Sequence, residues 1–491
     1  MWLTAEQLGS NKSDYNGLRL VKLGASLGVR NALLFATFMI FLSACSSLSG
    51  PEYKRPDVTV KKSWSENDAL NVSGIETIRL DWWRNFDDPF LDELISKALT
   101  NNLDLRILAA RVGVAEAAIG QANASRLPTI DAALGASFQK AEGGAVNRSV
   151  SQAVALGWEI DIWGKLKKGV SAQSAEFNAT EADWRAGYLT LASNVSSAYF
   201  QIRQFDEQIH RQRGALVKSR AILSIYDLRY EEGLAPKTQV IQQQAEVNRL
   251  DIDLLELQRL RQLTENALGT LLGVPAGDLN IPEQNLSDTV KVIAVPGGLP
   301  ADLLSRRPDI VAAEYRVLQA YELLGQAHLA KLPSISLTTN AGNTSAELSD
   351  LLKSWIFGLT PTVSIPIFDP NVQARLRVSE AQSKLAEEEY RATVMRAFEE
   401  VENELVNLAN RRLQHTQLLV RRDQLQLITE QIEAQLAEGL VTQLQVFESE
   451  RSLLDAELRL LENHQLLLSN TVALYKVLGG GWPPEDVVKT D

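Results

Sequence analysis

Hydrophobic residues follow two different periods along the chain, and the change between them separates strands from helices. In residues 129–163 apolar residues fall at every second position, as from Ile130 to Phe138, which predicts β-strands. The same alternation returns in residues 334–369. Each region is interpreted as a β-hairpin with about ten residues per strand, the length that spans a bilayer when the strands are tilted.

The alternating strands have one apolar face and one face of small or polar residues. This pattern is typical of a wall that faces lipid on one side and water on the other. A periplasmic β-hairpin that packs on its own core would give the same alternation, so periodicity alone leaves both interpretations open.

Helical spacing dominates the rest of the chain. Short helices are expected in residues 82–128 and 301–333, and both regions end at a Leu-Pro pair. Residues 164–273 and 370–479 read as two long helical hairpins, each with leucines in heptad phase. An opening helix of roughly 68 residues would be about 100 Å long at 1.5 Å per residue, too long for a compact globule.

The sequence contains an internal repeat whose two copies are 205 residues apart. The repeated positions are Asp104, Arg111, Gly120, Gln121, Leu127 and Pro128, which recur as Asp309, Arg316, Gly325, Gln326, Leu332 and Pro333. Solenoid arrays repeat at roughly 20–50 residues, so this spacing indicates a tandem duplication of one large unit. Residues 274–300 form an irregular, proline-containing connection between the halves.

Residues 1–44 have the layout of an export signal, with a basic flank, an apolar run that ends at Leu42, and small residues before Cys45. The run Leu42 to Cys45 (LSAC) resembles a bacterial lipobox, which makes Cys45 the expected lipidation site of a lipoprotein signal peptide. A buried free cysteine after an uncleaved anchor is the alternative. Residues 45–81 read as an extended lipidated tail, and residues 480–491 as a C-terminal tail.

Composition narrows the possible activities. A net charge of −12 argues against nucleic acid as a partner. One cysteine and four scattered histidines offer no metal-ligand spacing, so no metal and no cofactor is expected. Neither a phosphate-binding loop nor a nucleophile elbow is present in the sequence, which argues against an enzyme.

Two hairpins supply only four strands, whereas membrane barrels start at about eight. Strand edges left open in lipid would cost several kcal/mol for each unpaired backbone group, so several chains must pool their strands. Three chains would give twelve.

The chain resembles the outer membrane factors, the TolC-like outer membrane efflux proteins, and within them the lipidated OprM/NodT-type branch. The motifs that carry the resemblance cover essentially the whole mature length: Cys45 in its lipobox, the segment from Asp81 to Phe86 with Asp88 and Pro89, Asn102 to Asp104, the RRPD motif Arg306 to Asp309, the IPIFD strand end at Asp369, and the glycine-containing tips.

This resemblance implies a mainly α fold with a small β part: a tandem-duplicated TolC-like homotrimer whose 12-stranded transmembrane β-barrel continues into a long periplasmic α-helical barrel. It also implies the function, an outer-membrane exit duct of a tripartite efflux system, gated at its periplasmic helical tips. The implied partners are a periplasmic adaptor (a membrane fusion protein), an inner-membrane efflux pump of the RND type, and outer-membrane lipid of a Gram-negative bacterium.

The resemblance assigns the gate to the second tip. Family members often place an acidic residue six positions after the tip glycine, where this chain has Gln445, so Glu448 becomes the better gating candidate because it lies near the same helical face. An ordinary solvated Glu448 is the alternative. By the same resemblance, the candidates for adaptor contact are Gly233, Leu234, Gly439 and Leu440.

A different class of protein remains possible from the sequence. A periplasmic coiled-coil adaptor or scaffold lipoprotein would also carry long helical hairpins, although adaptors usually have one hairpin, and this chain has two. A lipid-anchored enzyme is a third option, which the lack of a convergent site disfavours.

Overall fold

The structure is a computed structural model that describes residues 50–61, 63–64, 79–140, 142–286, 303–351 and 353–482. The predicted signal peptide, Cys45, and parts of the N-terminal tail, the inter-repeat connection and the C-terminal tail lie outside the described residues. The chain divides into two compact units. Among the described residues, the sheet unit comprises those in 50–52, 128–168 and 323–378, and the helical unit comprises those in 53–127, 169–322 and 379–482.

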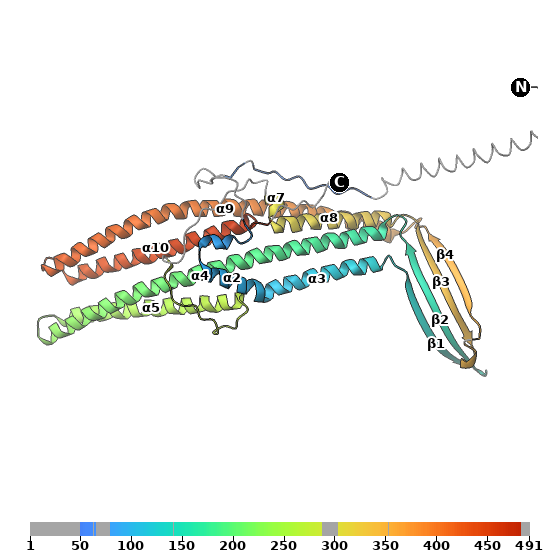
Figure 1. Cartoon of the computed structure of the whole chain (residues 1–491), viewed down its shortest axis with the longest axis horizontal. Helices are drawn as coiled ribbons and strands as arrows, with labels where there is room; N and C mark the ends of the chain where they lie inside the picture. Colours follow the sequence, from blue (N-terminus) through green and yellow to red (C-terminus); the bar gives the residue numbers. More distant parts are fainter. Residues whose placement is uncertain are drawn as a thin grey trace, which may run out of the picture. The chain divides into compact units, whose positions relative to one another are not determined.

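The sheet unit holds one four-stranded antiparallel sheet in the order β1-β2-β3-β4 (Figure 1). Its strands are β1 (Thr129–Lys140), β2 (Val146–Ile160), β3 (Ser334–Ser345) and β4 (Ile356–Ser364). The two hairpins come from different repeats, and β2 pairs with β3 over eleven residue pairs from Val150–Ser345 to Ile160–Ile335. The repeats are therefore joined edge to edge.

The strand register sorts the side chains onto two contrasting faces. Paired residues share a face, and neighbours along a strand alternate between faces. One face, called here the apolar face, carries exposed Ile130, Leu134, Phe138, Val154, Trp158, Phe357, Leu359 and Val363. The opposite, polar face carries small or hydroxyl residues such as Ser137, Ser149, Ser151, Ser336, Thr338, Thr360 and Thr362.

The helical unit begins with the 3-10 turn η2 (Trp82–Phe86) and the helix α2 (Pro89–Asn101). Asp88 caps α2, since its side chain accepts hydrogen bonds from the backbone N–H groups of Phe90 and Leu91. The buried hydroxyl of Tyr199 donates to the same carboxylate at 2.5 Å. One aspartate therefore starts a helix and ties it to a long helix that follows later in the chain.

The remaining shorter helices are α3 (Leu103–Ala124), α7 (Leu303–Arg306) and α8 (Pro308–Leu329). Asn102 caps α3 through the backbone N–H of Leu105, at 2.8 Å. Pro308 opens α8, a position where its missing N–H donor costs nothing. The two 22-residue helices α3 and α8 are the counterparts predicted by the sequence repeat.

Four long helices make two antiparallel hairpins (Figure 1). α4 (Lys165–Glu231) has 67 residues and α9 (Pro370–Ala437) has 68, while α5 (Lys237–Leu271) and α10 (Gln443–Val477) have 35 each. Lengths that agree within one residue are the structural form of the tandem repeat. Within the described residues, none of these helices combines the length and the hydrophobicity of a membrane-spanning helix.

One hydrophobic core holds both repeats together in the helical unit. Trp82 is fully buried and stacks on Tyr475 of α10, with ring centroids 5.2 Å apart and an angle of 12° between the rings. Phe86 packs edge-on against Phe200 of α4. Residues from η2, α2, α4, α5, α9 and α10 all contribute to this cluster. The N-terminal aromatic segment therefore packs where the two hairpins meet.

Candidate functional site

The first hairpin tip is a glycine turn at the end of α4. Gly233 has a φ of 72°, and its N–H donates to the carbonyl of Tyr230 at 3.0 Å, while the N–H of Leu234 reaches back to Arg229 at 2.7 Å. This pair of bonds is the Schellman arrangement, which needs a residue with left-handed backbone and is most easily made by glycine.

The second tip repeats the same geometry at the end of α9. Gly439 has a φ of 75°. Its N–H donates a hydrogen bond to the carbonyl of Leu436, and the N–H of Leu440 donates one to the carbonyl of Gln435, both at 2.9 Å. Leu234 and Leu440 follow the two glycines and are 68% and 70% exposed. The two tips therefore present a solvent-exposed leucine at equivalent positions of the repeat.

Gln445 has a structural role at the second tip. Its side-chain oxygen accepts a hydrogen bond from the backbone N–H of Thr442 at 2.9 Å, as half of a capping box that starts α10. This role was not predicted, although a threonine followed three residues later by glutamine is a sequence signature of such a cap. The first tip lacks this device, because Pro236 precedes α5 without a side-chain cap.

Glu448 lies one turn beyond Gln445 on α10 and is exposed. Its neighbour Val446 is buried at 3% exposure, so the two residues lie on different faces of the helix. The sequence prediction of Glu448 as a gating residue stays a prediction.

A cavity of about 330 Å³ separates the two hairpins near these tips. It is lined from all four long helices and is rich in charge, with Lys218, Glu246, Arg249, Glu433, Glu450 and Arg451 among its lining residues. Burial raises the pKa of Glu450, Lys218 opposes the shift, and Glu433 and Glu246 add to it. Glu450 is half-buried, and nothing local in the sequence of a glutamate-rich helix distinguishes it from its exposed neighbours.

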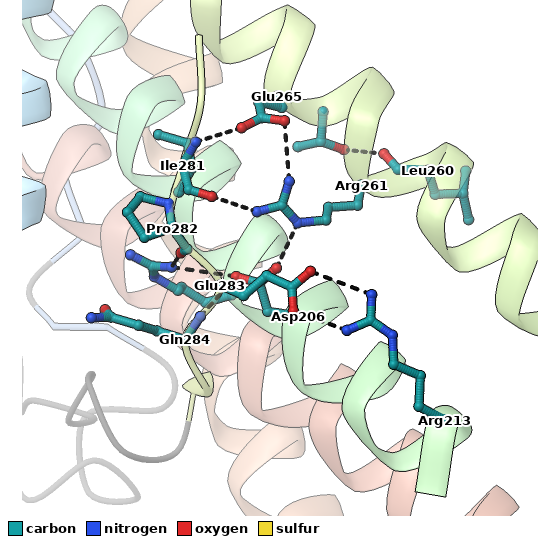
Figure 2. Close-up of polar contacts among 11 residues, drawn as sticks. Asp206, Arg213, Leu260, Arg261, Glu265, Ile281, Pro282, Glu283 and Gln284 are labelled. Carbon is teal, nitrogen blue, oxygen red and sulfur yellow. Dashed lines mark hydrogen bonds and ion pairs between the residues drawn. The ribbon is translucent and has the colours of Figure 1, made fainter. Parts of the chain in front are cut away.

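A buried polar network braces the α4/α5 hairpin farther from its tip (Figure 2). Arg261 of α5 is its centre: it donates to Asp206 at 2.6 Å, to Glu265 at 3.1 Å and to the carbonyl of Ile281 at 2.7 Å. Asp206 and Glu265 are almost fully buried. Two carboxylates and a carbonyl therefore satisfy one buried guanidinium.

The same network also binds the start of the inter-repeat connection, the segment that follows α5. Glu265 accepts a hydrogen bond from the N–H of Ile281 at 2.6 Å, and Asp206 accepts one from the N–H of Gln284 at 3.2 Å (Figure 2). Arg203 donates to the carbonyl of Pro282. Burial raises the pKa of Asp206, and the nearby Arg261 opposes that shift. The first part of the inter-repeat connection is thus held on the hairpin by backbone contacts.

Two histidines face each other where α9 meets α10. The rings of His415 and His464 lie 5.8 Å apart, and burial lowers the pKa of His464, with His415 acting in the same direction.

In the part of the chain that the structure describes, no group of three or more histidine, cysteine or acidic residues is arranged to hold a metal ion.

Comparison with known proteins identifies the family. The family described as "Outer membrane efflux protein" matches residues 94–274 and 299–480, one match for each repeat. The chain belongs to the outer membrane efflux protein family. This match confirms the tandem arrangement and the predicted family, and it sets aside the adaptor and scaffold alternative.

Relatives of the efflux protein family match over nearly the full length. The chain is 29% identical to the "Probable outer membrane lipoprotein SilC" of Salmonella typhimurium, over 92% of this chain and 98% of the relative. It is 30% identical to the "Pyoverdine export outer membrane protein OpmQ" of Pseudomonas aeruginosa, over 93% and 98%.

A solved structure of the open-state MtrE outer membrane channel of Neisseria gonorrhoeae is 27% identical and superposes with a TM-score of 0.79, covering 88% of this chain and 98% of that one. The predicted fold class, mainly helical with a small β part, is therefore confirmed. The protein is the outer-membrane channel of an efflux pump and resides in the outer membrane of a Gram-negative bacterium. It is a transporter component and not an enzyme.

Proposed function

We propose that three copies of this efflux protein close one twelve-stranded barrel in the outer membrane, and that their long helices continue it as a periplasmic duct. The observation that carries the proposal is the sheet, which has one apolar face, one polar face, and β1 and β4 at its two edges. Open edges in lipid would leave backbone groups unpaired at several kcal/mol each, so β1 of one copy must pair with β4 of the next.

The number of copies follows from the polar face. Two copies would give eight strands, and side chains fill the interior of an eight-stranded barrel. The small and hydroxyl residues of the polar face suit a wall that encloses water. Three copies supply twelve strands, and with them a wider interior.

Disulfide trapping tests the barrel. Ala133→Cys on β1 is combined in turn with Ile356→Cys, Gly358→Cys, Thr360→Cys and Thr362→Cys on the same face of β4. We expect one or two of these pairs to give covalent dimers and trimers that reductant dissolves. Ala133→Cys with Asn340→Cys, on the interior strand β3, is the matched control. A monomer under native conditions, or the absence of a cross-link at every β4 position, would refute the proposed trimer.

The periplasmic gate and the docking surface are proposed at the tips. Exposed Leu234 and Leu440, held outward by the two glycine turns, are apolar contacts for the tip of a periplasmic adaptor, which would connect the channel to an RND-type inner-membrane pump. Three copies of Glu448 would form a carboxylate ring that attracts cations and narrows the duct.

Single-channel recording tests the gate. Glu448→Gln should lower cation selectivity, because it removes the carboxylate charge and keeps the size of the side chain. Glu448→Ala should also raise the open conductance, because it shortens the side chain. Glu462→Gln, about four turns farther from the tip on α10, should leave both properties unchanged. A Glu448→Gln channel identical to the unaltered protein would move the gate elsewhere. For docking, Leu234→Ser and Leu440→Ser should weaken adaptor binding without changing the conductance.

Lipidation of Cys45 is proposed as a second attachment to the membrane. A single acyl chain binds membranes weakly, so the anchor acts together with the barrel. Mass spectrometry of the N-terminal peptide tests this directly. Cys45→Ser should lose the acyl mass and keep the trimer, and an unmodified cysteine in the mature protein would refute the assignment.

A further inference from the structure

The connection between β3 and β4 is fastened to the sheet by two side-chain amides. It contains the short turn η4 (Leu348–Asp350). Gln152 of β2 donates to the carbonyl of Leu351 at 2.6 Å. Asn343 of β3 donates to the carbonyls of Asp350 and Leu351, both at 3.1 Å. We call this set of three hydrogen bonds the latch.

The latch lies on the apolar face of the sheet. Gln152 and Asn343 are directly paired in the β2–β3 register, so they share a face. Gln152 is also paired with Leu134 of β1, one of the exposed residues of the apolar face. The β3–β4 connection is therefore folded toward the side assigned to lipid and away from the polar face that lines the duct.

The position of the two amides on the apolar face gives a physical reason for the hydrogen bonds of the latch. An amide on a lipid-facing wall costs free energy unless its hydrogen bonds are made. Here the amide nitrogens of both side chains donate to carbonyls of the connection, and Leu351, whose carbonyl accepts from both, is only 5% exposed. Removal of the connection would leave two polar groups stranded on an apolar wall.

The exposed residues of the connection suit the boundary between lipid and water. Leu348 is 74% exposed, and Trp355 is 40% exposed and stacks on Phe357 of the apolar face with ring centroids 6.4 Å apart. Tryptophan is enriched at the head-group level of membranes. Polar groups accompany them, as Lys353 and Asp350 form an exposed ion pair at 2.6 Å.

The height of the latch agrees with this boundary. Trp163 marks the other end of the sheet, where its indole N–H donates to the carbonyl of Pro333 at 2.7 Å. From Pro333 to Asn343 the strand advances about 33 Å at 3.3 Å per residue, which becomes about 25 Å along the membrane normal at a tilt of about 40°. The apolar band of such barrels is also about 25 Å tall.

We infer that the β3–β4 connection is an outward-folded membrane anchor: the latch of Gln152 and Asn343 seats Leu348 and Trp355 in the head-group region of the outer leaflet. This inference rests on the proposed barrel. Its consequence is that this connection does not cover the outer mouth of the duct.

Site-specific quenching tests the anchor in the full-length protein reconstituted in lipid vesicles. A fluorophore is placed at Ser349→Cys in the connection, at Phe138→Cys on the apolar face as the lipid control, and at Thr344→Cys on the polar face as the water control. The native chain, whose one cysteine is Cys45, gives the background. Spin-labelled phospholipids and dissolved iodide are the two quenchers.

We expect the label at position 349 to be quenched by the spin-labelled lipid, as at position 138. Gln152→Leu combined with Asn343→Leu should abolish that quenching and expose the label to iodide. Quenching by iodide alone at position 349, as at position 344, would overturn the inference, and so would protection from both quenchers.

The labelled chain with an intact latch decides the location by itself, so a double variant that fails to fold does not remove the test. Conductance is recorded from the same vesicles. Vesicles without conductance, even when Glu448→Ala removes the proposed constriction, would mean that the proposed duct fails. Conductance together with a label reached only by iodide would mean that only the anchor fails.

Discussion

Arg55 makes a two-point ion pair with Glu314, and both nitrogen–oxygen distances are 2.7 Å. The Glu314 side chain is only 1% exposed, whereas that of Arg55 is 39% exposed. The hydroxyl of Tyr53 donates to the same carboxylate at 3.0 Å. The segment before the helices therefore supplies the partners of a carboxylate buried in α8.

Arg55→Ala should destabilise the protein, because it leaves the Glu314 carboxylate buried without its cation. Loss of one partner from a buried pair costs about 3–5 kcal/mol, and the exposure of Arg55 reduces this to about 2–3 kcal/mol. The free energy of unfolding in guanidinium measures the effect. Lys61→Ala removes an exposed pair with Glu402 and should cost less than about 1 kcal/mol. Equal losses for the two variants would contradict this account.

Gly439→Ala should loosen the second tip. The φ of 75° is unfavourable for a residue with a Cβ by about 1–2 kcal/mol, and no atom lies within 4 Å of the added Cβ, so the backbone alone is responsible. Faster amide hydrogen exchange in the last turn of α9 is the expected result. Gly439→Asn should be milder because asparagine tolerates this conformation. Gly113→Ala, inside α3 and also in open space, serves as the control and should be neutral or slightly stabilising.

Gln445→Ala should fray the start of α10 by removing one half of the capping box with Thr442. The loss is about 1 kcal/mol, as for other helix caps. Gln445→Glu should keep the cap, because a carboxylate accepts the same hydrogen bond and is favoured at a helix N-terminus. Hydrogen exchange of the first turn of α10 separates the two variants, and identical exchange in both would mean that the cap contributes nothing.

Arg261→Met should release the inter-repeat segment from the α4/α5 hairpin. It leaves Glu265 buried without Arg261, whereas Asp206 keeps its ion pair with Arg203 at 3.3 Å, so the cost is at most about 3–5 kcal/mol. Protease cleavage near residue 283 should become faster. Arg259→Met, two residues away in an exposed pair with Glu256, is the matched control and should leave both stability and cleavage unchanged. Unchanged cleavage in Arg261→Met would show that the network does not hold the segment.

Glu450 should make the contact between the hairpins stronger in acid. Its pKa in the folded protein is raised above the usual value of 4.5 by burial, so the neutral form is favoured by folding. The stability that it contributes is complete below that value and is lost as the pH rises through the raised pKa. Thermal unfolding from about pH 4 to about pH 8 should show this slope. Glu450→Gln should flatten it, whereas Glu448→Gln should retain it.

Local patterns in the sequence predict much of the architecture. The alternation from Ile130 to Phe138 marks a strand whose faces differ, and the spacing of leucines marks helices of great length. The Schellman turns at Gly233 and Gly439 were accessible too, because a glycine that interrupts a helical pattern has a local backbone reason. The capping role of Gln445 is equally local, because a threonine followed three residues later by glutamine marks such a cap.

Contacts between residues that are far apart in the sequence could not be predicted from these local patterns. Trp82 meets Tyr475, Arg55 meets Glu314, and Gln152 meets the backbone of Leu351, and none of these pairs leaves a periodic trace in the sequence. The partial burial of Glu450 is similar, since it depends on how the two hairpins approach each other and not on the neighbours of Glu450 along α10.

The sequence by itself determined the duplication, the two-faced strands and the long helices, because each of these is a repeat or a period that the chain displays locally. The tertiary structure decided that the two strand hairpins join in one sheet, that one core unites both repeats, and that the β3–β4 connection folds onto the apolar face. The physical reason is that hydrogen bonds and burial depend on distances in space, and the chain specifies those distances only when all of its elements pack together.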